Sequence, residues 1–188
     1  MKTTYVAFLR AVNVGGRTVK MEALRVLLAT AGLQEVRTYI ASGNVIFAAE
    51  ESEPVLVSRI EALLAQALGF RVDTLLRTAA ELQALIGANP FAGELGPADL
   101  RLYVSFLRDE PSAELRAGLP ALSTAEDRFA IAGRHLFCLV RKRPGKEPFS
   151  NVLVEKRLKT VTTTRDWNTV RTIVDKHLTG AQSKAPNI

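Results

Sequence analysis

The stretch VRTYIASGNVIFAA, residues 36–49, decides how the strands of this chain are arranged. Two apolar-rich runs, residues 36–41 and 45–49, flank Ser42-Gly43-Asn44. Glycine, serine and asparagine favour tight turns, because they tolerate left-handed backbone or bond to their own main chain. The stretch therefore predicts a β-hairpin with antiparallel strands. A parallel pair would need a crossover of about a dozen residues, usually a helix, so a doubly wound parallel sheet is disfavoured.

The segments around this hairpin complete a β-α-β-β-α-β order with a trailing helix. Apolar residues at helical spacing predict the helices, and Ser52 is a suitable amino-terminal cap for the second of them. In chain order we predict a strand over 4–10, a helix over 21–31, the hairpin, a helix after Ser52, a strand over 72–76 and a short helix over 78–86.

The same order recurs after a stretch rich in glycine and proline, residues 88–99. We predict a strand over 100–106, a helix over 112–118, a hairpin of 128–131 with 135–141, a helix over 152–158, a strand over 161–163 and a closing helix over 167–178. The fold class is therefore α+β, with two ferredoxin-like halves whose sheets are antiparallel. We place the halves at 1–92 and 93–188, and we expect a flexible tail from residue 180.

The net charge of +6 is unevenly distributed over the 188 residues. Residues 1–133 hold 13 basic and 15 acidic residues, whereas residues 134–188 hold 12 and 4. Such asymmetry is typical of proteins that meet an anionic partner, such as a nucleotide, another phosphorylated molecule or nucleic acid. A solubilising, fully hydrated face is the alternative explanation.

A glycine-containing loop follows the first predicted strand and carries groups suited to an anion. After Asn13, the pair Gly15 and Gly16 lets the backbone approach a ligand, while Arg17 and Lys20 add charge beside the start of a helix. The spacing matches neither G-x-x-x-x-G-K-[ST] nor G-x-G-x-x-G, so no known phosphate loop is present. A tight strand-to-helix connection is the alternative explanation.

The predicted topology brings a second polar loop to the same place. In a split β-α-β sheet the first strand lies antiparallel to the third, so the end of one meets the start of the other. We therefore expect the loop over residues 13–17 to lie beside the turn that contains Ser42 and Asn44.

The stretch TTTRDWNTV, residues 162–170, carries an unusual number of hydrogen-bonding side chains where the closing helix begins. Trp167 falls on the apolar face of that helix and is expected in the core. Thr163, Thr164, Arg165 and Asn168 are expected at its amino end, where an oxyanion or a sugar would be bound. We expect this end to converge with the two loops on one cleft.

Three motifs resemble those of a bacterial family, the domain of unknown function 1697. They are Arg10-Ala-Val-Asn-Val-Gly-Gly, Ser42-Gly-Asn-Val and Thr163-Thr-Arg-Asp-Trp-Asn-Thr. They occur in the family's order and span nearly the whole chain. The resemblance implies a small cytosolic protein with paired ferredoxin-like subdomains and implies no activity. The family often has asparagine where this chain has Asp166.

Three functional hypotheses follow. The leading one is a binding module for a small phosphorylated or nucleotide-like anion, held by Asn13, Gly15, Gly16, Arg17, Lys20, Ser42, Asn44, Thr163, Thr164, Arg165 and Asn168. The second is an enzyme acting on such a ligand, in which Arg17 or Arg165 stabilises charge in the transition state. The third is sequence-independent binding of nucleic acid through residues 141–146 and 156–159.

Other classes of function find little support in the sequence. One cysteine, Cys138, and two histidines provide no metal-ligand cluster, and no cofactor motif is present, so we expect neither a metal nor a cofactor. No apolar run reaches the ~18 residues of a membrane span, so we expect no membrane partner. The single cysteine favours a cytoplasmic location, and the sequence leaves the oligomeric state and any catalysis open.

Overall fold

The computed structural model describes residues 1–143 and 151–179. By their internal contacts they form two compact units, of which the second consists of residues 83–172. The first consists of residues 1–82 together with the segment from Ile173 onward. Each unit is described by itself below.

Two predictions concern the division and the ends of the chain. The sequence places the boundary after residue 92 and assigns the whole closing helix to the second half, whereas the contacts divide the chain after Leu82 and again before Ile173. The predicted flexible tail and Lys146, which belongs to the basic stretch, lie outside the described residues.

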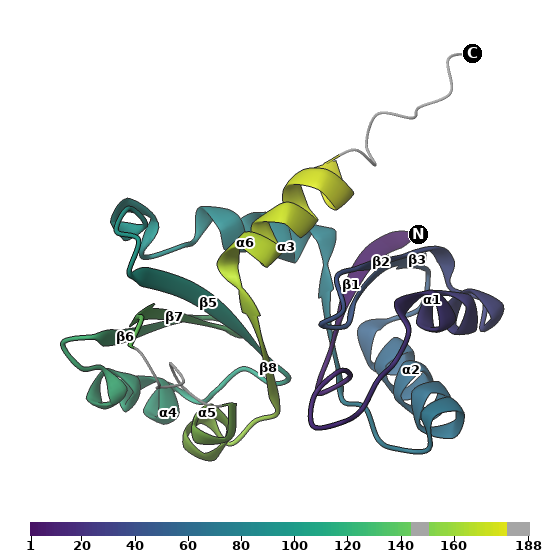
Figure 1. Ribbon diagram of the computed structural model, residues 1–188, viewed down its shortest axis with the longest axis horizontal. Helices are drawn as coiled ribbons and strands as arrows, with labels where there is room; N and C mark the ends of the chain where they lie inside the picture. Colours follow the sequence, from purple (N-terminus) through teal and green to yellow (C-terminus); the bar gives the residue numbers. More distant parts are fainter. Residues whose placement is uncertain (144–150, 180–188) are drawn as a thin grey trace, which may run out of the picture. The chain divides into compact units, whose positions relative to one another are not determined.

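The first unit is a four-stranded antiparallel sheet with two helices on one face (Figure 1). Its elements are β1 (Thr3–Leu9), α1 (Met21–Thr30), β2 (Gln34–Tyr39), β3 (Asn44–Ala49), α2 (Glu53–Leu68) and β4 (Thr74–Thr78). The strand order is β2-β3-β1-β4, with β1 antiparallel to both of its neighbours. This is the ferredoxin-like arrangement predicted from the order of strands and helices around the 36–49 hairpin.

The core of the first unit explains the uninterrupted apolar run near the amino terminus. Tyr5, Ala7 and Leu9 alternate along β1 and belong to the cluster that packs against α1 and α2. Val6 and Phe8 point to the opposite face and are also fully buried. Both faces of this strand are therefore covered, which favours apolar residues at every position rather than at every second one.

The second unit repeats this architecture (Figure 1). Its elements are η1 (Ala92–Glu94), β5 (Leu100–Leu107), α4 (Ala113–Ala117), η2 (Leu119–Leu122), β6 (Asp127–Ala132), β7 (His135–Arg141), α5 (Asn151–Leu158) and β8 (Thr162–Asp166). The antiparallel sheet has the order β6-β7-β5-β8, and α4 and α5 lie on the same face. The prediction of two ferredoxin-like halves is thus confirmed.

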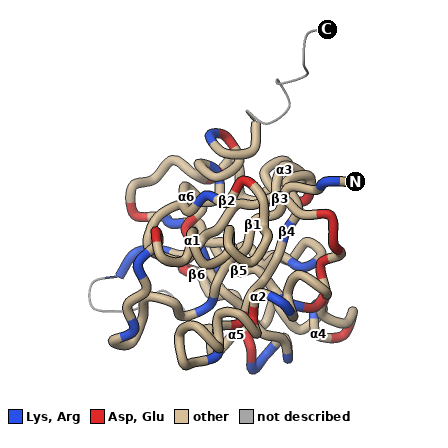
Figure 2. The backbone as a smooth tube through the Cα atoms, turned by 90° about the vertical axis from the view of Figure 1, so that its right-hand side faces the viewer, with Lys and Arg blue, Asp and Glu red and all other residues tan. Residues whose placement is uncertain are grey.

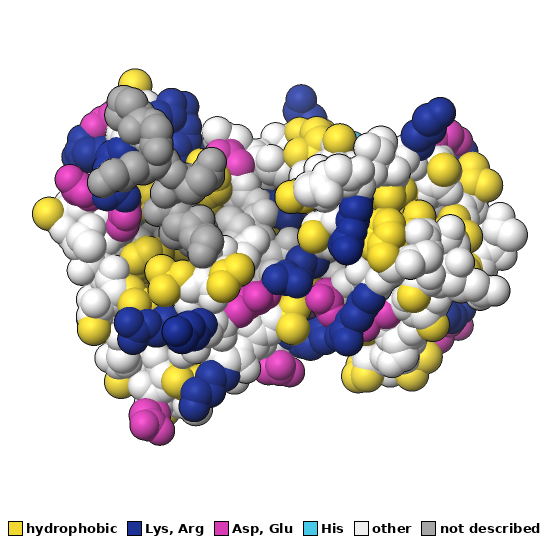
Figure 3. All heavy atoms as spheres, turned by 60° about the horizontal axis from the view of Figure 1, so that its bottom comes forward, with side chains coloured by type: hydrophobic (Ala, Val, Ile, Leu, Met, Phe, Trp, Pro, Cys, Tyr) yellow, Lys and Arg dark blue, Asp and Glu magenta, His cyan; other side chains and the backbone are white. Residues whose placement is uncertain are grey.

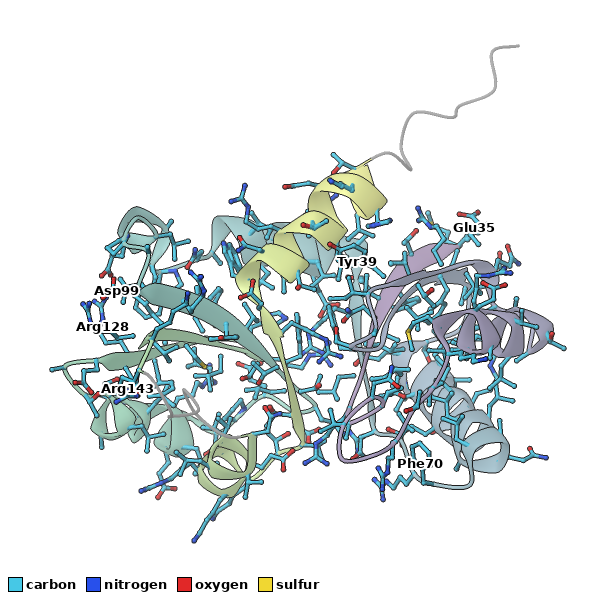
Figure 4. All side chains as sticks on the ribbon, in the orientation of Figure 1. Glu35, Tyr39, Phe70, Asp99, Arg128 and Arg143 are labelled. Atoms are coloured by element: carbon cyan, nitrogen blue, oxygen red, sulfur yellow. The ribbon has the colours of Figure 1, made fainter. Side chains whose placement is uncertain are left out.

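A helix follows the sheet in each half of the chain. They are α3 (Ala79–Gly87) and α6 (Trp167–Thr172), and α6 continues into the π-helical segment η3 (Ile173–Leu178). Within the first unit, Arg37 of β2 donates a hydrogen bond to the His177 carbonyl oxygen at 3.1 Å, and the Tyr39 and His177 rings lie 5.1 Å apart (Tyr39 is labelled in Figure 4). These contacts explain why η3 belongs to the first unit although the sequence assigns it to the second.

Among the described residues, none of the helices combines the length and the apolar character needed to cross a membrane.

Candidate functional site

Asn13 organises the glycine loop of the first unit. Its Oδ1 accepts a hydrogen bond from the Val19 amide at 2.6 Å. Its Nδ2 donates to the Val19 carbonyl at 3.2 Å and to the Ala41 carbonyl at 2.6 Å. The last of these bonds ties the loop to the residue before the 42–44 turn, so the two loops lie side by side as the topology predicts. Both polar atoms of the Asn13 carboxamide are therefore engaged with main chain.

The turn at residues 42–44 is packed onto the end of β1. Gly43 has a φ of +79°, and a Cβ there would lie 3.1 Å from the Cβ of Leu9. The Leu9 amide donates to the Gly43 carbonyl at 2.9 Å. Asn44 is fully buried, and its Nδ2 donates to the Tyr39 carbonyl and to Ser42 Oγ. The Asn44 side chain thus holds the turn together from inside.

The exposed part of the glycine loop includes Gly15, Gly16, Arg17 and Lys20. Both glycines have positive φ, +65° and +83°, and within the described chain neither of their amides donates a hydrogen bond. The Arg17 guanidinium lies 4.3 Å from the ring centroid of Phe70, which is labelled in Figure 4. The loop therefore presents two amides and a stacked cation to solvent.

The structure corrects the expected position of Thr163, Thr164 and Arg165. They lie within β8 rather than at the amino end of the helix, because β8 extends to Asp166, three residues beyond the predicted strand. Arg165 is only 7% exposed, and its Nη1 donates to Thr163 Oγ1 at 2.8 Å and to the Thr164 carbonyl at 2.9 Å. Burial lowers the pKa of Arg165 to about 10. Thr163 is buried as well, at 3% exposure.

Thr164 takes part in an internal hydrogen-bond network on the helix-covered face of the sheet. Its hydroxyl lies 2.7 Å from Ser105 Oγ on β5 and donates to Asn151 Oδ1 on α5 at 2.6 Å. Buried hydroxyls are satisfied in this way in most folded proteins. Thr162 and Thr164 therefore owe part of their position to contacts with Asn151 of α5.

The end of the same stretch opens onto a cavity of about 230 Å³ that lies entirely within the second unit. Asp166, Trp167, Asn168 and Arg171 line one side of it, and Arg101 of β5 lines another. The remaining wall comes from the segment between η1 and β5 and from the start of β5, residues Leu95, Gly96, Pro97, Ala98, Leu100 and Leu102. Of the predicted site residues, the cavity contains only Asn168.

The cavity holds charges of both signs that are not paired with each other. Arg101 Nη1 donates to the Leu100 carbonyl at 3.1 Å, and Arg171 makes no hydrogen bond or ion pair in the described part of the chain. Asp166 Oδ1 accepts from the Asn168 amide at 2.8 Å and so caps the helix. Two guanidinium groups and one carboxylate thus border one small volume.

Sequence reasoning missed Arg101 and Arg171, although the sequence contains a signal for each. Arg171 lies three residues after Asn168, so the two share one face of the helix. In the sheet, Asp166 pairs with Tyr103, and Arg101 lies two residues away on β5, so it projects from the same face as Asp166. The register of β5 with β8 is needed to see the second relation.

The predicted convergence joins residues 13–17 and 42–44 of the first unit with residues 163–168, which belong to the second. It remains a prediction, whereas the proximity of the two first-unit loops is established by the Asn13–Ala41 hydrogen bond.

Comparison with known proteins places the chain in a family. A family model described as "Protein of unknown function (DUF1697)" matches residues 1–137. The chain belongs to this family. The DUF1697 match covers the glycine loop and the 42–44 turn and ends within β7. It includes Arg101 and the neighbouring wall of the cavity, whereas Asp166, Trp167, Asn168 and Arg171 lie beyond it.

A solved structure shares the fold. The conserved bacterial protein SP0830 from Streptococcus pneumoniae is 23% identical to this DUF1697 chain, with a TM-score of 0.71 over 93% of this chain and 98% of that one. No protein with a curated description matches.

The described residues contain no group of three or more histidine, cysteine, aspartate or glutamate side chains that could hold a metal ion. Cys138 is fully buried, and the pKa of its thiol is raised, chiefly because burial disfavours the thiolate.

Proposed function

We propose that this protein binds a small anionic ligand, of the phosphorylated or nucleotide-like class, and that the cavity of the second unit receives its anionic group. The observation that carries the proposal is the pair Arg101 and Arg171. Both side chains border the cavity, and within the described chain neither has an acidic partner. Guanidinium groups bind phosphate and carboxylate oxygens through directed, charge-assisted hydrogen bonds.

Several other arginines of the second unit differ from this pair because acidic neighbours neutralise them. Arg128 pairs with Glu94, Arg141 with Asp99, and Arg143 with both Glu126 and Asp127. Figure 4 labels Asp99, Arg128 and Arg143 on the side of the unit where these pairs lie. The contrast supports the view that Arg101 and Arg171 are available to a ligand.

The size and composition of the cavity favour a small molecule. At about 230 Å³ it is below the ~300–1,000 Å³ typical of sites for drug-sized ligands. Asn168 is exposed, and its carboxamide offers both a donor and an acceptor next to the arginines. A phosphate or carboxylate bearing a short organic group is compatible with these dimensions.

The first-unit loop offers a second set of groups for the same class of ligand. Gly15 and Gly16 present amides, and Arg17 and Lys20 present charge. Asn13 and Asn44, which the sequence assigns to the ligand, are engaged with main-chain atoms and would act by holding the loops in place. If the protein is an enzyme, Arg17 is the better candidate for stabilising charge in the transition state, because Arg17 is exposed and Arg165 is buried.

The nucleic-acid hypothesis receives less support. Arg141 and Arg143, which belong to the basic stretch, are paired with carboxylates, and α5 carries Glu155 next to Lys156 and Arg157 (Figure 2). On the face drawn in Figure 3, basic side chains form separate groups, and some of these groups have acidic side chains beside them. A nucleic acid would therefore meet a lower net charge than the sequence suggests.

A thermal-shift screen with inorganic phosphate, nucleotides and small phosphorylated metabolites tests the proposal. A ligand present at about 100 times its dissociation constant stabilises the fold by roughly 2.7 kcal/mol. We expect Arg171→Gln to melt like the wild type and to lose the ligand-induced shift. Arg157→Gln is the matched control, because Arg157 is an exposed helical arginine outside the cavity.

Two results would contradict the proposal: no shift with any compound in the panel, or an equal shift in Arg171→Gln and the wild type. Raising the salt concentration separates the nucleic-acid alternative, since affinity for a duplex falls steeply with salt when several phosphates are contacted.

A further inference from the structure

We infer that the cavity of the second unit selects a zwitterion, a small anion that also carries an ammonium group, which Asp166 recognises. This inference rests on the proposed function, because it takes the anionic group to be held by Arg101 and Arg171. It adds the chemical class of the rest of the ligand.

Asp166 is fixed at the cavity wall by two features of the fold. It is the last residue of β8, opposite Tyr103 of β5 in the register. Its Oδ1 accepts a hydrogen bond from the Asn168 amide at 2.8 Å. Its Oδ2 accepts no hydrogen bond in the described part of the chain, and no Lys, Arg or His there lies within ion-pair distance. The carboxylate is therefore held in place with one oxygen available.

The signs of the charges around the cavity disfavour a ligand that is only an anion. Arg101 and Arg171 attract a phosphate or carboxylate, but Asp166 borders the same 230 Å³ and repels it. A ligand that places an ammonium against Asp166 removes this repulsion and gains a charge-assisted hydrogen bond. Discrimination between ligands arises from such a penalty against the wrong partner as well as from attraction to the right one.

The other lining residues are compatible with a short carbon spacer between the two charged ends. Leu95, Pro97, Leu102 and Trp167 contribute apolar surface to the cavity. A hydroxyl in place of the ammonium would still donate a hydrogen bond to Asp166, but it would leave the negative charge of the carboxylate uncompensated. The charge of the donor is thus the property that the site distinguishes.

Three probes that differ only at one end test the inference: O-phosphoethanolamine, 2-hydroxyethyl phosphate and ethyl phosphate. Their dissociation constants are measured by calorimetry with the full-length protein. For the wild type we expect O-phosphoethanolamine to bind about tenfold more tightly than ethyl phosphate, with 2-hydroxyethyl phosphate between them.

Asp166→Asn should abolish this preference. Asparagine also caps helices, so the variant keeps the bond to the Asn168 amide and differs mainly in charge. Asp175→Asn is the matched control, because Asp175 is an exposed acidic residue that follows in η3 and does not line the cavity. It should retain the wild-type preference.

The outcomes separate this inference from the proposed function. Equal binding of all three probes by the wild type, or an undiminished preference in Asp166→Asn, overturns the inference and leaves anion binding in place. Failure of every probe and of inorganic phosphate to bind overturns the proposed function and the inference with it.

Discussion

The fourth strands of the two sheets, β4 and β8, occupy the same place in their units and show which features belong to the fold. Arg77 of β4 pairs in register with Val6, and Arg165 of β8 with Val104. Each arginine is buried, and each donates from Nη1 to the carbonyl of the preceding residue, at 2.6 and 2.9 Å. A buried arginine that recurs at the same position in both units is better explained by the fold than by a ligand.

The two strands differ in how they lead into the following helix. In the first unit Thr78 and Glu81 form a reciprocal cap, in which the Thr78 amide donates to Glu81 Oε2 and the Glu81 amide donates to Thr78 Oγ1. In the second unit Asp166 caps α6 by accepting a hydrogen bond from the Asn168 amide. The first residue of α6 is Trp167, whereas the first residue of α3 is Ala79. The features peculiar to the second unit are therefore those that border its cavity.

The largest expected effect concerns Trp167. The equivalent position of the first unit is Ala79, which has no large side chain. The Trp167 side chain is 6% exposed, and its ring lies 6.2 Å from that of Phe137. Trp167→Ala should lower the free energy of unfolding by ~3–5 kcal/mol, because a large aromatic side chain is lost from the core. Denaturation in urea measures this, with Trp167→Phe as a control that should lose less. A loss below about 1 kcal/mol would mean that α6 is anchored no more firmly than α3.

The hairpin turns of the two units give an intermediate effect. Gly43 and Gly133 both have positive φ, +79° and +54°, but only at Gly43 would a Cβ meet close neighbours, at 3.1 Å from Leu9 Cβ. Gly43→Ala should cost roughly 2–4 kcal/mol from backbone strain and crowding together, and Gly133→Ala about 1–2 kcal/mol from strain alone. Thermal melts of the two variants measure the difference. Equal losses would show that the first turn is not packed more tightly than the second.

The smallest effect is a pH dependence that arises from His177 in the first unit. Its pKa is lowered below the usual 6.5, first by burial and then by the charges of Arg37 and Lys176. The folded state therefore favours neutral imidazole, and the unfolded chain takes up a proton first as the pH falls. Stability should be lost as the pH drops through 6.5 toward the folded pKa, and kept above it.

Between about pH 7 and pH 5 the melting temperature of His177→Gln should fall by less than that of the wild type. Parallel declines in the two proteins would show that η3 does not contribute to the acid sensitivity of the first unit.

The sequence determines the fold to a large extent, because its signals are local. The Ser42-Gly43-Asn44 turn between two apolar runs predicts the hairpin, and the recurrence of that pattern predicts the second sheet. The antiparallel pairing of β1 with β3 then places Phe8 opposite Asn44. This pairing brings the two polar loops of the first unit together. These steps require only turn chemistry and the alternation of side chains along a strand.

The candidate site was less accessible to sequence reasoning, because a polar residue looks the same in sequence whether it is buried or exposed. Arg165 and Thr163 have the chemistry of a binding site, but β8 continues past them and turns them inward. Asn44 has the chemistry of a ligand contact, but its side-chain amide donates hydrogen bonds to the Tyr39 carbonyl and to Ser42 Oγ.

The sequence by itself determined the β-α-β-β-α-β order of both halves, because each element depends on interactions among neighbours in the chain. Only the tertiary structure decided which polar groups are available. Arg101 and Arg171 border one cavity although 70 positions separate them, because β5 pairs with β8 and α6 follows directly from β8. Whether a charge is paired, buried or open to a ligand depends on contacts between distant segments, and those are set by packing.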